Sequence, residues 1–191
     1  MTKSLIKTIM ELTVKTTKIK NVKKLYIRAF PKSERLPYSV LKFLTLFKGI
    51  SFNEYYDGDL FCGFTYTVET DYTLFIYYLA IDENLRGKGY GSKILSLIKN
   101  SYPNKTITLN VEPIDENADN YSQRLTRLSF YKRNGFLDSG YTVYEVGGGF
   151  TVLYTPKNVE GGQTFEFYPQ KFKGVFKKLT FNIVNVKVEK C

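Results

Sequence analysis

LRGKGYGSKIL, residues 85–95, places three glycines at alternate positions and then passes into an apolar rhythm. It follows YTLFIYYLAID (72–82), a nearly continuous apolar run that predicts a strand in the middle of a sheet, with both faces covered. The segment GSKILSLIKN (91–100) places Ile94 and Leu95 at helical spacing. We therefore predict a buried strand, a glycine turn and a helix in succession.

Glycines between the end of a buried strand and the start of a helix let several backbone N–H groups converge on an outside anion, because no side chain blocks the approach. The helix dipole adds attraction, and Arg86 and Lys88 supply mobile positive charge at the same place. This pattern predicts a phosphate-binding turn. The alternative is a turn that only makes room for the helix to pack on the sheet.

The spacing excludes two common nucleotide loops. A Walker A loop needs GxxxxGK[ST], but Gly87-Lys88 is followed by Gly89. A Rossmann fingerprint needs GxGxxG, but here the third glycine, Gly91, comes one residue early and Ser92 stands in its place. Any phosphate held here belongs to another kind of ligand.

Strand and helix patterns alternate along the rest of the chain, without an internal repeat. The expected strands are 11–17, 50–59, 60–69, 72–82 and 106–112, with a hairpin at 141–155 that turns at Gly147–Gly149; the expected helices are 19–30, 36–49 with Gly49 as its C-cap, 91–100, and 121–136 with Leu125, Leu128 and Tyr131 at helical intervals. After residue 156, FKGVFKKLTF (172–181) suggests a short helix and NIVNVKVE (182–189) a strand or arm. The pattern indicates an α/β (α+β) protein.

Composition limits the classes that remain. The chain has 191 residues, no histidine and two cysteines, Cys62 and Cys191, neither in a metal-ligand spacing. Acid and base chemistry must therefore come from carboxylates, tyrosines, lysines or the backbone, and we expect no metal site. No run approaches the 18 or so apolar residues of a membrane span and no signal peptide is evident, so we expect a soluble cytoplasmic protein and no membrane partner.

The net charge of +10 raises the question of nucleic acid. The lysines are scattered along a chain rich in Lys, Asn, Tyr, Ile and Phe, so a general compositional bias accounts for the charge as well as a binding surface does. Nucleic acid is not the partner we expect, although a nucleic-acid-associated protein stays open as a class.

The arrangement [QR]xxGx[GA] after a long apolar strand, Arg86-Gly87-Lys88-Gly89-Tyr90-Gly91, resembles the acetyl-CoA motif of the GNAT superfamily of N-acetyltransferases. FYKRNGF (130–136), about forty residues downstream, is similar to the family's second motif, a helix that ends in Tyr before a Gly-Phe turn. The order of elements resembles the family from about residue 11 to 155. We expect a GNAT-like domain over 1–156 and an extension, 157–191, packed on it.

The resemblance implies a mixed, mostly antiparallel twisted sheet of about seven strands with about four helices, splayed between the strand ending LAID and the strand ending NVE. Acetyl-CoA is the implied cofactor, used as acetyl donor. Its pantetheine arm would pair with the backbone of Leu79, Ala80 and Ile81. Its pyrophosphate would lie on the amides from Arg86 to Ser92, that is, of Arg86, Gly87, Lys88, Gly89, Tyr90, Gly91 and Ser92.

The resemblance also implies an amine that attacks the thioester directly, with Tyr131 as the general acid that protonates the leaving thiolate. Glu112, at the end of the strand beside the splay, is a candidate general base, and Glu34, with Tyr38 nearby, lies where the family lines the acceptor pocket. The residues alone favour a simpler interpretation, in which Tyr131 is an aromatic filler of a helix face and both carboxylates are ordinary surface groups. Water could carry the proton instead.

The chain departs from the family where Asn and Ala often precede the tyrosine, because Arg124 and Arg127 stand there. The two arginines lie on a solvated face or add phosphate contacts. The acceptor, a small-molecule or peptide amine, is not written in these motifs, nor is the choice between monomer and homodimer. A non-catalytic acyl-CoA-binding or sensor protein remains the alternative function.

Overall fold

The computed structural model describes residues 12–16, 21–145, 148–156 and 187–190 of the chain. Its strands are β1 (Leu12–Lys15), β2 (Ile50–Asp57), β3 (Leu60–Glu69), β4 (Thr73–Ile81), β5 (Thr106–Val111), β6 (Leu137–Glu145), β7 (Gly148–Tyr154) and β8 (Lys187–Lys190). Its α-helices are α1 (Val22–Ala29), α2 (Tyr38–Leu44), α3 (Tyr90–Ser101) and α4 (Tyr121–Arg133), with short 3-10 turns η1 (Lys32–Glu34) and η2 (Glu83–Leu85).

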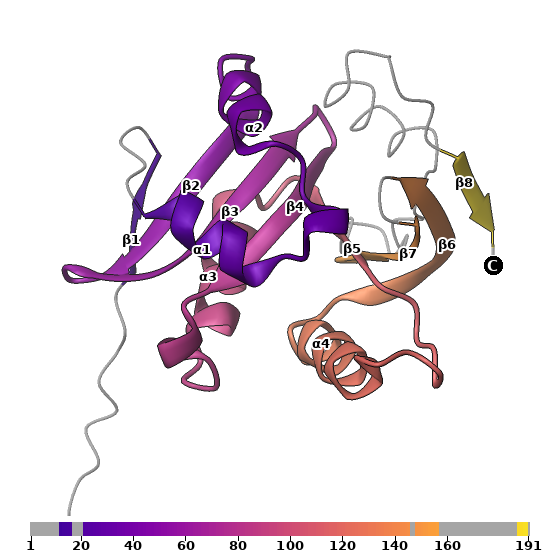
Figure 1. The fold of residues 1–191 in the computed structure, drawn as a ribbon. Helices are drawn as coiled ribbons and strands as arrows, with labels where there is room; N and C mark the ends of the chain where they lie inside the picture. The colour runs from indigo at the N-terminus through magenta and orange to yellow at the C-terminus, as the bar shows by residue number, and fades with distance from the viewer. Residues whose placement is uncertain (1–11, 17–20, 146–147, 157–186, 191) are drawn as a thin grey trace, which may run out of the picture.

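The strands form one sheet in the order β1-β2-β3-β4-β5-β7-β6-β8 (Figure 1). Every neighbouring pair is antiparallel except β4 and β5, which run parallel because α3 connects them. The predicted mixed, mostly antiparallel sheet with four helices is confirmed. It has eight described strands, since β8 pairs with β6 and extends the far edge.

Two hydrophobic cores lie on opposite faces of this sheet. Residues of α1 and α2, including Tyr26 and Leu41, pack against one face, and residues of α3 and α4, including Ile94 and Tyr131, pack against the other. Alternate residues of β4 enter the two cores: Leu74 and Ile76 join α3, whereas Phe75 and Tyr78 join α1. The prediction that this strand is central, with both faces covered, is confirmed.

The sheet opens between β4 and β5. Their parallel pairing runs only from Thr73 opposite Thr106 to Ile76 opposite Leu109. On its other side, β4 pairs with β3 along its length, but the register shifts so that Tyr77 is an extra residue between Ile76 and Tyr78. A bulge of this kind bends a strand, and it lies at the point where β5 leaves β4. The predicted splay is therefore present, and residues 77–81 face it without a strand partner on that side.

Three local expectations need correction. The helix predicted to reach Gly49 ends at Leu44, because the Thr45 hydroxyl donates to the Lys42 carbonyl (2.7 Å) and the chain continues as a turn. Gly49, with φ of 82°, instead turns the chain toward β2. Leu125 is 39% exposed, so it does not share the buried face of α4 with Tyr131.

Two of the three glycines predicted to form the hairpin turn lie in a strand instead. Gly148 and Gly149 already belong to β7, paired with Glu145 and Tyr144. A Cβ on Gly149 would lie 3.0 Å from the Tyr144 ring, so this glycine allows a ring to lie across the strand rather than making the turn.

The C-terminal strand predicted within 182–189 is confirmed at Lys187–Lys190, whereas the helix expected at 172–181 lies outside the described residues. The division into 1–156 and 157–191 stays a prediction. Within the part of the chain that the structure describes, no helix is long and apolar enough to cross a membrane.

Candidate active site

A cavity of about 1150 Å³ occupies the region where β4 and β5 part, and residues from β4, α3, α4, the end of β5 and the loop after α1 line it. It contains most of the residues predicted from the sequence: Glu34, Leu79, Ala80, Ile81, Arg86, Gly87, Gly89, Tyr90, Gly91, Ser92, Glu112 and Tyr131. Lys88 and Tyr38 are not among its lining residues. The predicted cofactor, acid and acceptor positions therefore share one cavity, with these two exceptions.

The glycine turn presents backbone donors at one end of the cavity. Gly87 and Gly89 have φ of 74° and 87°, a conformation that favours glycine. Gly89 is the N-cap of α3 and has no side chain to cap the helix, so the first N–H groups of α3 lack the usual side-chain acceptor. Such a helix start attracts anions.

Two of the predicted amides are already used inside the turn. The Lys88 N–H donates to the Leu85 carbonyl and the Arg86 N–H to the Glu83 carbonyl, each at 3.4 Å. Lys88 is also an exposed residue that does not line the cavity. The backbone donors best placed for an anion are thus those of Gly87 and of 89–92, and Arg86 also lines the cavity.

Gly91 has a different role from its two neighbours. Its φ is not positive, and a Cβ there would lie 3.0 Å from the Phe130 ring and 3.6 Å from Ile81. The missing side chain lets α4 approach the start of α3. The packing explanation considered for the glycine pattern therefore applies to Gly91, whereas Gly87 and Gly89 are required by the backbone conformation.

Polar contacts fix the turn to the rest of the domain. The Tyr90 hydroxyl donates to Asp57 at the end of β2 (2.8 Å), and this hydrogen bond together with burial raises the pKa of Tyr90 to about 12. Arg28 of α1 contacts Asp82 (3.5 Å) and Glu83 (2.8 Å), just before the glycines. The start of α3 is thus held from the β2 side and from α1.

Tyr131 lies in the last turn of α4 and is 9% exposed. Its ring packs edge-to-face on Phe130 and Phe136, and the residue lines the cavity. Burial raises its pKa to about 12, although the nearby charge of Arg127 lowers it in part. Because its pKa is raised, the phenol is protonated near neutral pH. Within the described residues the hydroxyl has no hydrogen-bond partner, so its proton is available to a bound molecule.

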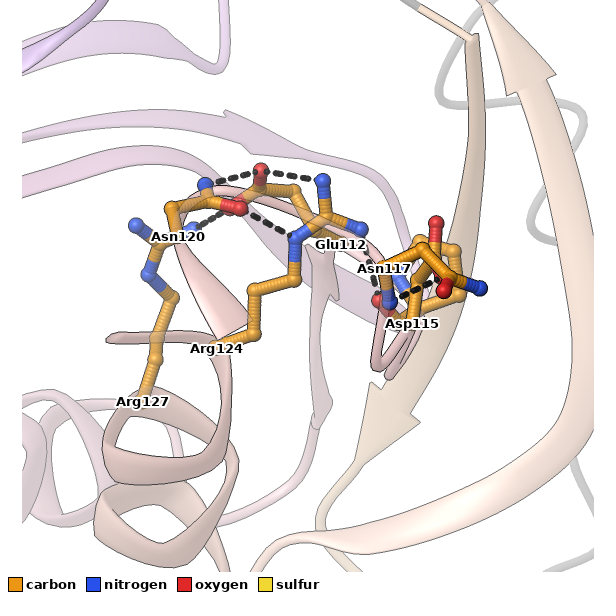
Figure 2. Close-up of polar contacts among 7 residues, drawn as sticks. Glu112, Asp115, Asn117, Asn120, Arg124 and Arg127 are labelled. Carbon is orange, nitrogen blue, oxygen red and sulfur yellow. Dashed lines mark hydrogen bonds and ion pairs between the residues drawn. The ribbon is translucent and has the colours of Figure 1, made fainter. Parts of the chain in front are cut away.

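Glu112, directly after β5, lies in a network of polar side chains (Figure 2). It accepts a hydrogen bond from the Asn120 amide (2.9 Å) and forms ion pairs with Arg127 and, at 3.4 Å, with Arg124. Burial by itself would raise the pKa of Glu112, but the Asn120 hydrogen bond and the two guanidinium groups hold it below its ordinary value. A carboxylate held in this way has little tendency to accept a proton near neutral pH.

The two arginines share a partner that the sequence did not indicate, and contacts of either one with the donor's phosphates stay a prediction. Both contact Glu112, and Arg124 also donates to the Asn120 oxygen (2.6 Å) and to the Pro113 carbonyl (2.9 Å). The Arg124 side chain is 18% exposed and outside the cavity lining, whereas that of Arg127 is 41% exposed and lines the cavity. Of these two arginines, only Arg127 therefore lines the cavity.

Glu34 enters the cavity from the loop between α1 and α2. The Tyr78 hydroxyl donates to the Glu34 carbonyl (2.9 Å) and accepts from the Leu36 N–H (3.3 Å), so β4 holds this loop beside the splay. The Glu34 carboxylate has no hydrogen bond or ion pair with another described residue. Burial, and then the negative charge of Glu112, raises its pKa above the ordinary value, while Arg127 and Arg124 lower it in part.

Tyr38 does not take the acceptor-lining position that we predicted. Its ring packs on Tyr26 (6.2 Å between ring centroids) and on Phe52 (5.7 Å), at the edge of the core beneath α1 and α2. As the first residue of α2 it faces the sheet, whereas Glu34, four residues earlier, lies in the turn that reaches the splay. The prediction for this loop therefore has support at Glu34 alone.

Residues 52–137 match the model of the acetyltransferase (GNAT) domain. The segment that carries the glycine turn and α4 is therefore similar to a GNAT acetyltransferase domain. The match extends from β2 to the first residue of β6, so it includes the splay, the glycine turn and α4. Over 115 residues the chain is 30% identical to the Bacillus subtilis (strain 168) protein named "Putative acetyltransferase YjbC"; this segment is 56% of the present chain and 57% of that relative's length.

Solved structures share the fold. A GNAT-family protein of Bacteroides thetaiotaomicron superposes with a TM-score of 0.60 at 23% identity, covering 87% of this chain and 91% of its own. The ribosomal-protein-S18-alanine N-acetyltransferase of Escherichia coli gives 0.58 at 12% identity, over 81% and 100%. A Bacillus subtilis acetyltransferase in complex with CoA gives 0.53 at 19% identity, over 76% and 98%. At these identities the likeness concerns the GNAT fold.

Several residues of this site were not singled out from the sequence. Tyr78 holds the Glu34 loop, Asn120 and Arg127 hold Glu112, and Phe130 fills the space left at Gly91. Arg127 was noticed as a departure from the family pattern, but nothing in the sequence gave its partner. Tyr78, Asn120 and Phe130 lie in an apolar strand, a polar loop and a helix, respectively. The need to form those elements already accounts for their residue types, so nothing in the sequence indicated a role in the site.

Proposed function

We propose that this protein is an N-acetyltransferase, which transfers an acetyl group from acetyl-CoA to a primary amine by direct attack in a ternary complex. The observation that carries the proposal is a single cavity that joins an uncapped helix start, a buried tyrosine hydroxyl and an unpaired carboxylate, Glu34. These are the three groups that the reaction needs: one for the donor's phosphates, one for the leaving sulfur and one for the amine.

The donor end of the cavity fits acetyl-CoA. The N–H groups of Gly87 and of 89–92 would hold the pyrophosphate, and the unpaired edge of β4 at Leu79–Ile81 would hydrogen-bond the amides of the pantetheine arm as an added strand does. The CoA bound to the Bacillus subtilis acetyltransferase of the same fold supports this assignment. The thioester then lies deeper in the splay, beside α4.

The chemistry uses the protein's own groups. The amine nitrogen forms a bond to the thioester carbon, the carbon–sulfur bond breaks, and the sulfur leaves with the electron pair. Tyr131 donates its proton to that sulfur, and the amine loses one proton to a base. Burial raises the pKa of a phenol and of a thiol in the same way, so the burial that raises the pKa of Tyr131 would also favour a protonated product thiol beside it.

Of the two carboxylates considered from the sequence, Glu34 is the better base. Glu112 is held by Asn120 and two arginines, which favour its charged form, whereas the carboxylate of Glu34 has no partner among the described residues and a raised pKa. A base with a pKa closer to the working pH accepts a proton more readily. We therefore propose that Glu34 receives the amine and its proton, and that Glu112 positions Arg127.

Thiol release from acetyl-CoA tests the proposal. The assay uses a panel of amines, polyamines, amino sugars, aminoglycosides, amino acids and peptide N-termini, with a melting scan in parallel to report cofactor binding. Amine-dependent release of the thiol supports the enzyme. A rise in melting temperature with acetyl-CoA, without release for any amine, would favour the acyl-CoA-binding or sensor protein. Neither effect with any acyl-CoA would count against both functions.

A further inference from the structure

Four charged side chains surround the inner end of the cavity or support it. Glu34 and Arg127 line it directly, Glu112 lines it while it contacts both arginines, and Arg124 holds Glu112 from outside the lining. The charges of Arg127 and Arg124 bear on Glu34 across the cavity, as does that of Glu112. Arg124 and Arg127 carry two positive charges against the one negative charge of Glu112. The carboxylate of Glu34 supplies the second negative charge.

Arg127 has donors to spare on the cavity side. Its contact with Glu112 uses Nη1, and the structure gives its other nitrogens no partner among the described residues. The side chain is 41% exposed and lines the cavity. Arg127 precedes Tyr131 by one helical turn, so the two side chains project from the same face of α4. Figure 2 shows Arg127 reaching from α4 toward Glu112, at the end of β5.

We propose that the acceptor carries a carboxylate near its amine, and that Arg127 binds this carboxylate while Glu34 receives the amine. The inference rests on the proposed function and names its substrate class, an amino acid or a molecule with the same ammonium and carboxylate groups. A guanidinium with a free edge pairs with a planar carboxylate through two hydrogen bonds.

The charge balance favours this class over a simple amine. The four side chains sum to zero, and Arg133 at the end of α4 adds a further positive charge to the lining. A zwitterion leaves the total charge unchanged, whereas an ammonium without a carboxylate adds an uncompensated positive charge. The phosphates of acetyl-CoA would be held separately, by the N–H groups at the start of α3.

The test compares matched acceptors. Thiol release is measured with amino acids, with the same amino acids as C-terminal amides, and with the corresponding decarboxylated amines. We expect kcat/KM to be about 10- to 100-fold higher for the carboxylates, which is the worth of one charge-assisted pair. Arg127→Gln should remove this preference by raising KM for the carboxylate acceptors, with KM for acetyl-CoA unchanged. Arg127→Lys keeps the positive charge but cannot form the paired hydrogen bonds of a guanidinium, so it should keep part of the preference for carboxylate acceptors.

Lys132→Gln is the matched control, because it removes a positive charge from the same helix at an exposed residue that does not line the cavity. It should keep the ratio between carboxylate and amide acceptors. Equal use of acids and amides by the parent protein would overturn the inference and leave the proposed function standing. A rise in KM for acetyl-CoA alone in Arg127→Gln would overturn it too, since Arg127 would then be a donor contact.

Binding is measured separately, so that the inference is tested even without turnover. With the protein saturated by CoA, N-acetylated amino acids should raise the melting temperature more than their amides do, and Arg127→Gln should abolish the difference. No difference between the two series in the parent protein would refute the carboxylate site. Absence of thiol release for every acceptor, with this binding difference present, would instead refute the proposed enzyme.

Discussion

Replacing Tyr131 by phenylalanine removes the hydroxyl that we propose protonates the leaving sulfur. The ring would keep its packing on Phe130 and Phe136, and no hydrogen bond to another described residue would be lost. We therefore expect the free energy of unfolding to change by less than about 0.5 kcal/mol, the range of substitutions that disturb no packed or bonded group. The affinity for acetyl-CoA should be equally unaffected.

The expected loss is in turnover. General acid catalysis contributes about 100- to 10,000-fold, and the proposed role of Tyr131 assigns all of this to its hydroxyl, so kcat should fall by that factor. The pKa of Tyr131 is about 12, so the acid is protonated at neutral pH and the parent rate should fall only as the pH rises toward that value. The variant should lack this alkaline decline.

The assay is thiol release under saturating acetyl-CoA and amine, across pH, with a melting scan to show that the variant folds. Tyr102→Phe is the matched control, since Tyr102 ends α3 outside the cavity lining and should keep the parent rate. If Tyr131→Phe acetylates its amine at the parent rate at every pH, Tyr131 is a packing residue and the general-acid assignment fails.

Three further predictions test the turn, the base and the sheet. Acetyl-CoA at 100 times its Kd should raise the melting temperature of the parent by about 5–10 °C. This rise should largely disappear in Gly89→Val, because φ of 87° is unfavourable for valine. A parent-like rise in the variant would contradict the phosphate turn. Below the raised pKa of Glu34 the parent rate should fall as the carboxylate becomes protonated, and Glu34→Gln should lose this acid limb while running about 100-fold slower at neutral pH; persistence of the limb would place the base elsewhere. Gly63→Ala should lower the free energy of unfolding by about 1–3 kcal/mol in a urea titration, since its Cβ would lie 2.3 Å from the Ala80 oxygen; an unchanged midpoint would show that β3 and β4 can move apart there.

The central part of the fold could be predicted because local and long-range signals agree there. The run from Thr73 to Ile81 is apolar on both faces, and both faces are covered in the structure. Gly87 and Gly89 have positive φ, a conformation that favours glycine, so the presence of glycine at both positions indicated the turn in the sequence. Such positions leave a signature because no other residue type meets the same steric demand.

Boundaries and pairings were harder for physical reasons. The apolar rhythm of 36–49 continues past Leu44, yet the helix ends there because a side-chain hydroxyl and a turn compete with it. Tyr38 and Glu34 are four residues apart in one loop region, but only contacts from Tyr78 decide which of them reaches the cavity. Such contacts join residues more than forty positions apart, and no local pattern records them.

The electrostatics of the site could not be foreseen for the same reason. Glu112 stands out in the sequence as a carboxylate at the end of a strand, which is a suitable place for a base. Its partners Asn120, Arg124 and Arg127 lie in the next loop and helix and convert it into an anchored anion with a lowered pKa. The identity of an acidic residue predicts its charge, while its neighbours decide whether it can take up a proton.

The short parallel seam between β4 and β5 has a consequence for motion. Only four register positions, from Thr73 to Ile76 on one side, join the half of the sheet formed by β1–β4 to the half formed by β5–β8. A small rotation about this seam changes the separation of the strands least at Thr73 and most beyond Val111, where Glu112 lies. We expect those amides of residues 79–81 that face the splay, and not β3, to exchange with solvent deuterium quickly in the empty protein and slowly once a ligand bridges the two halves. If product release requires the two halves to separate, its rate would depend on how easily the sheet bends at these four paired positions.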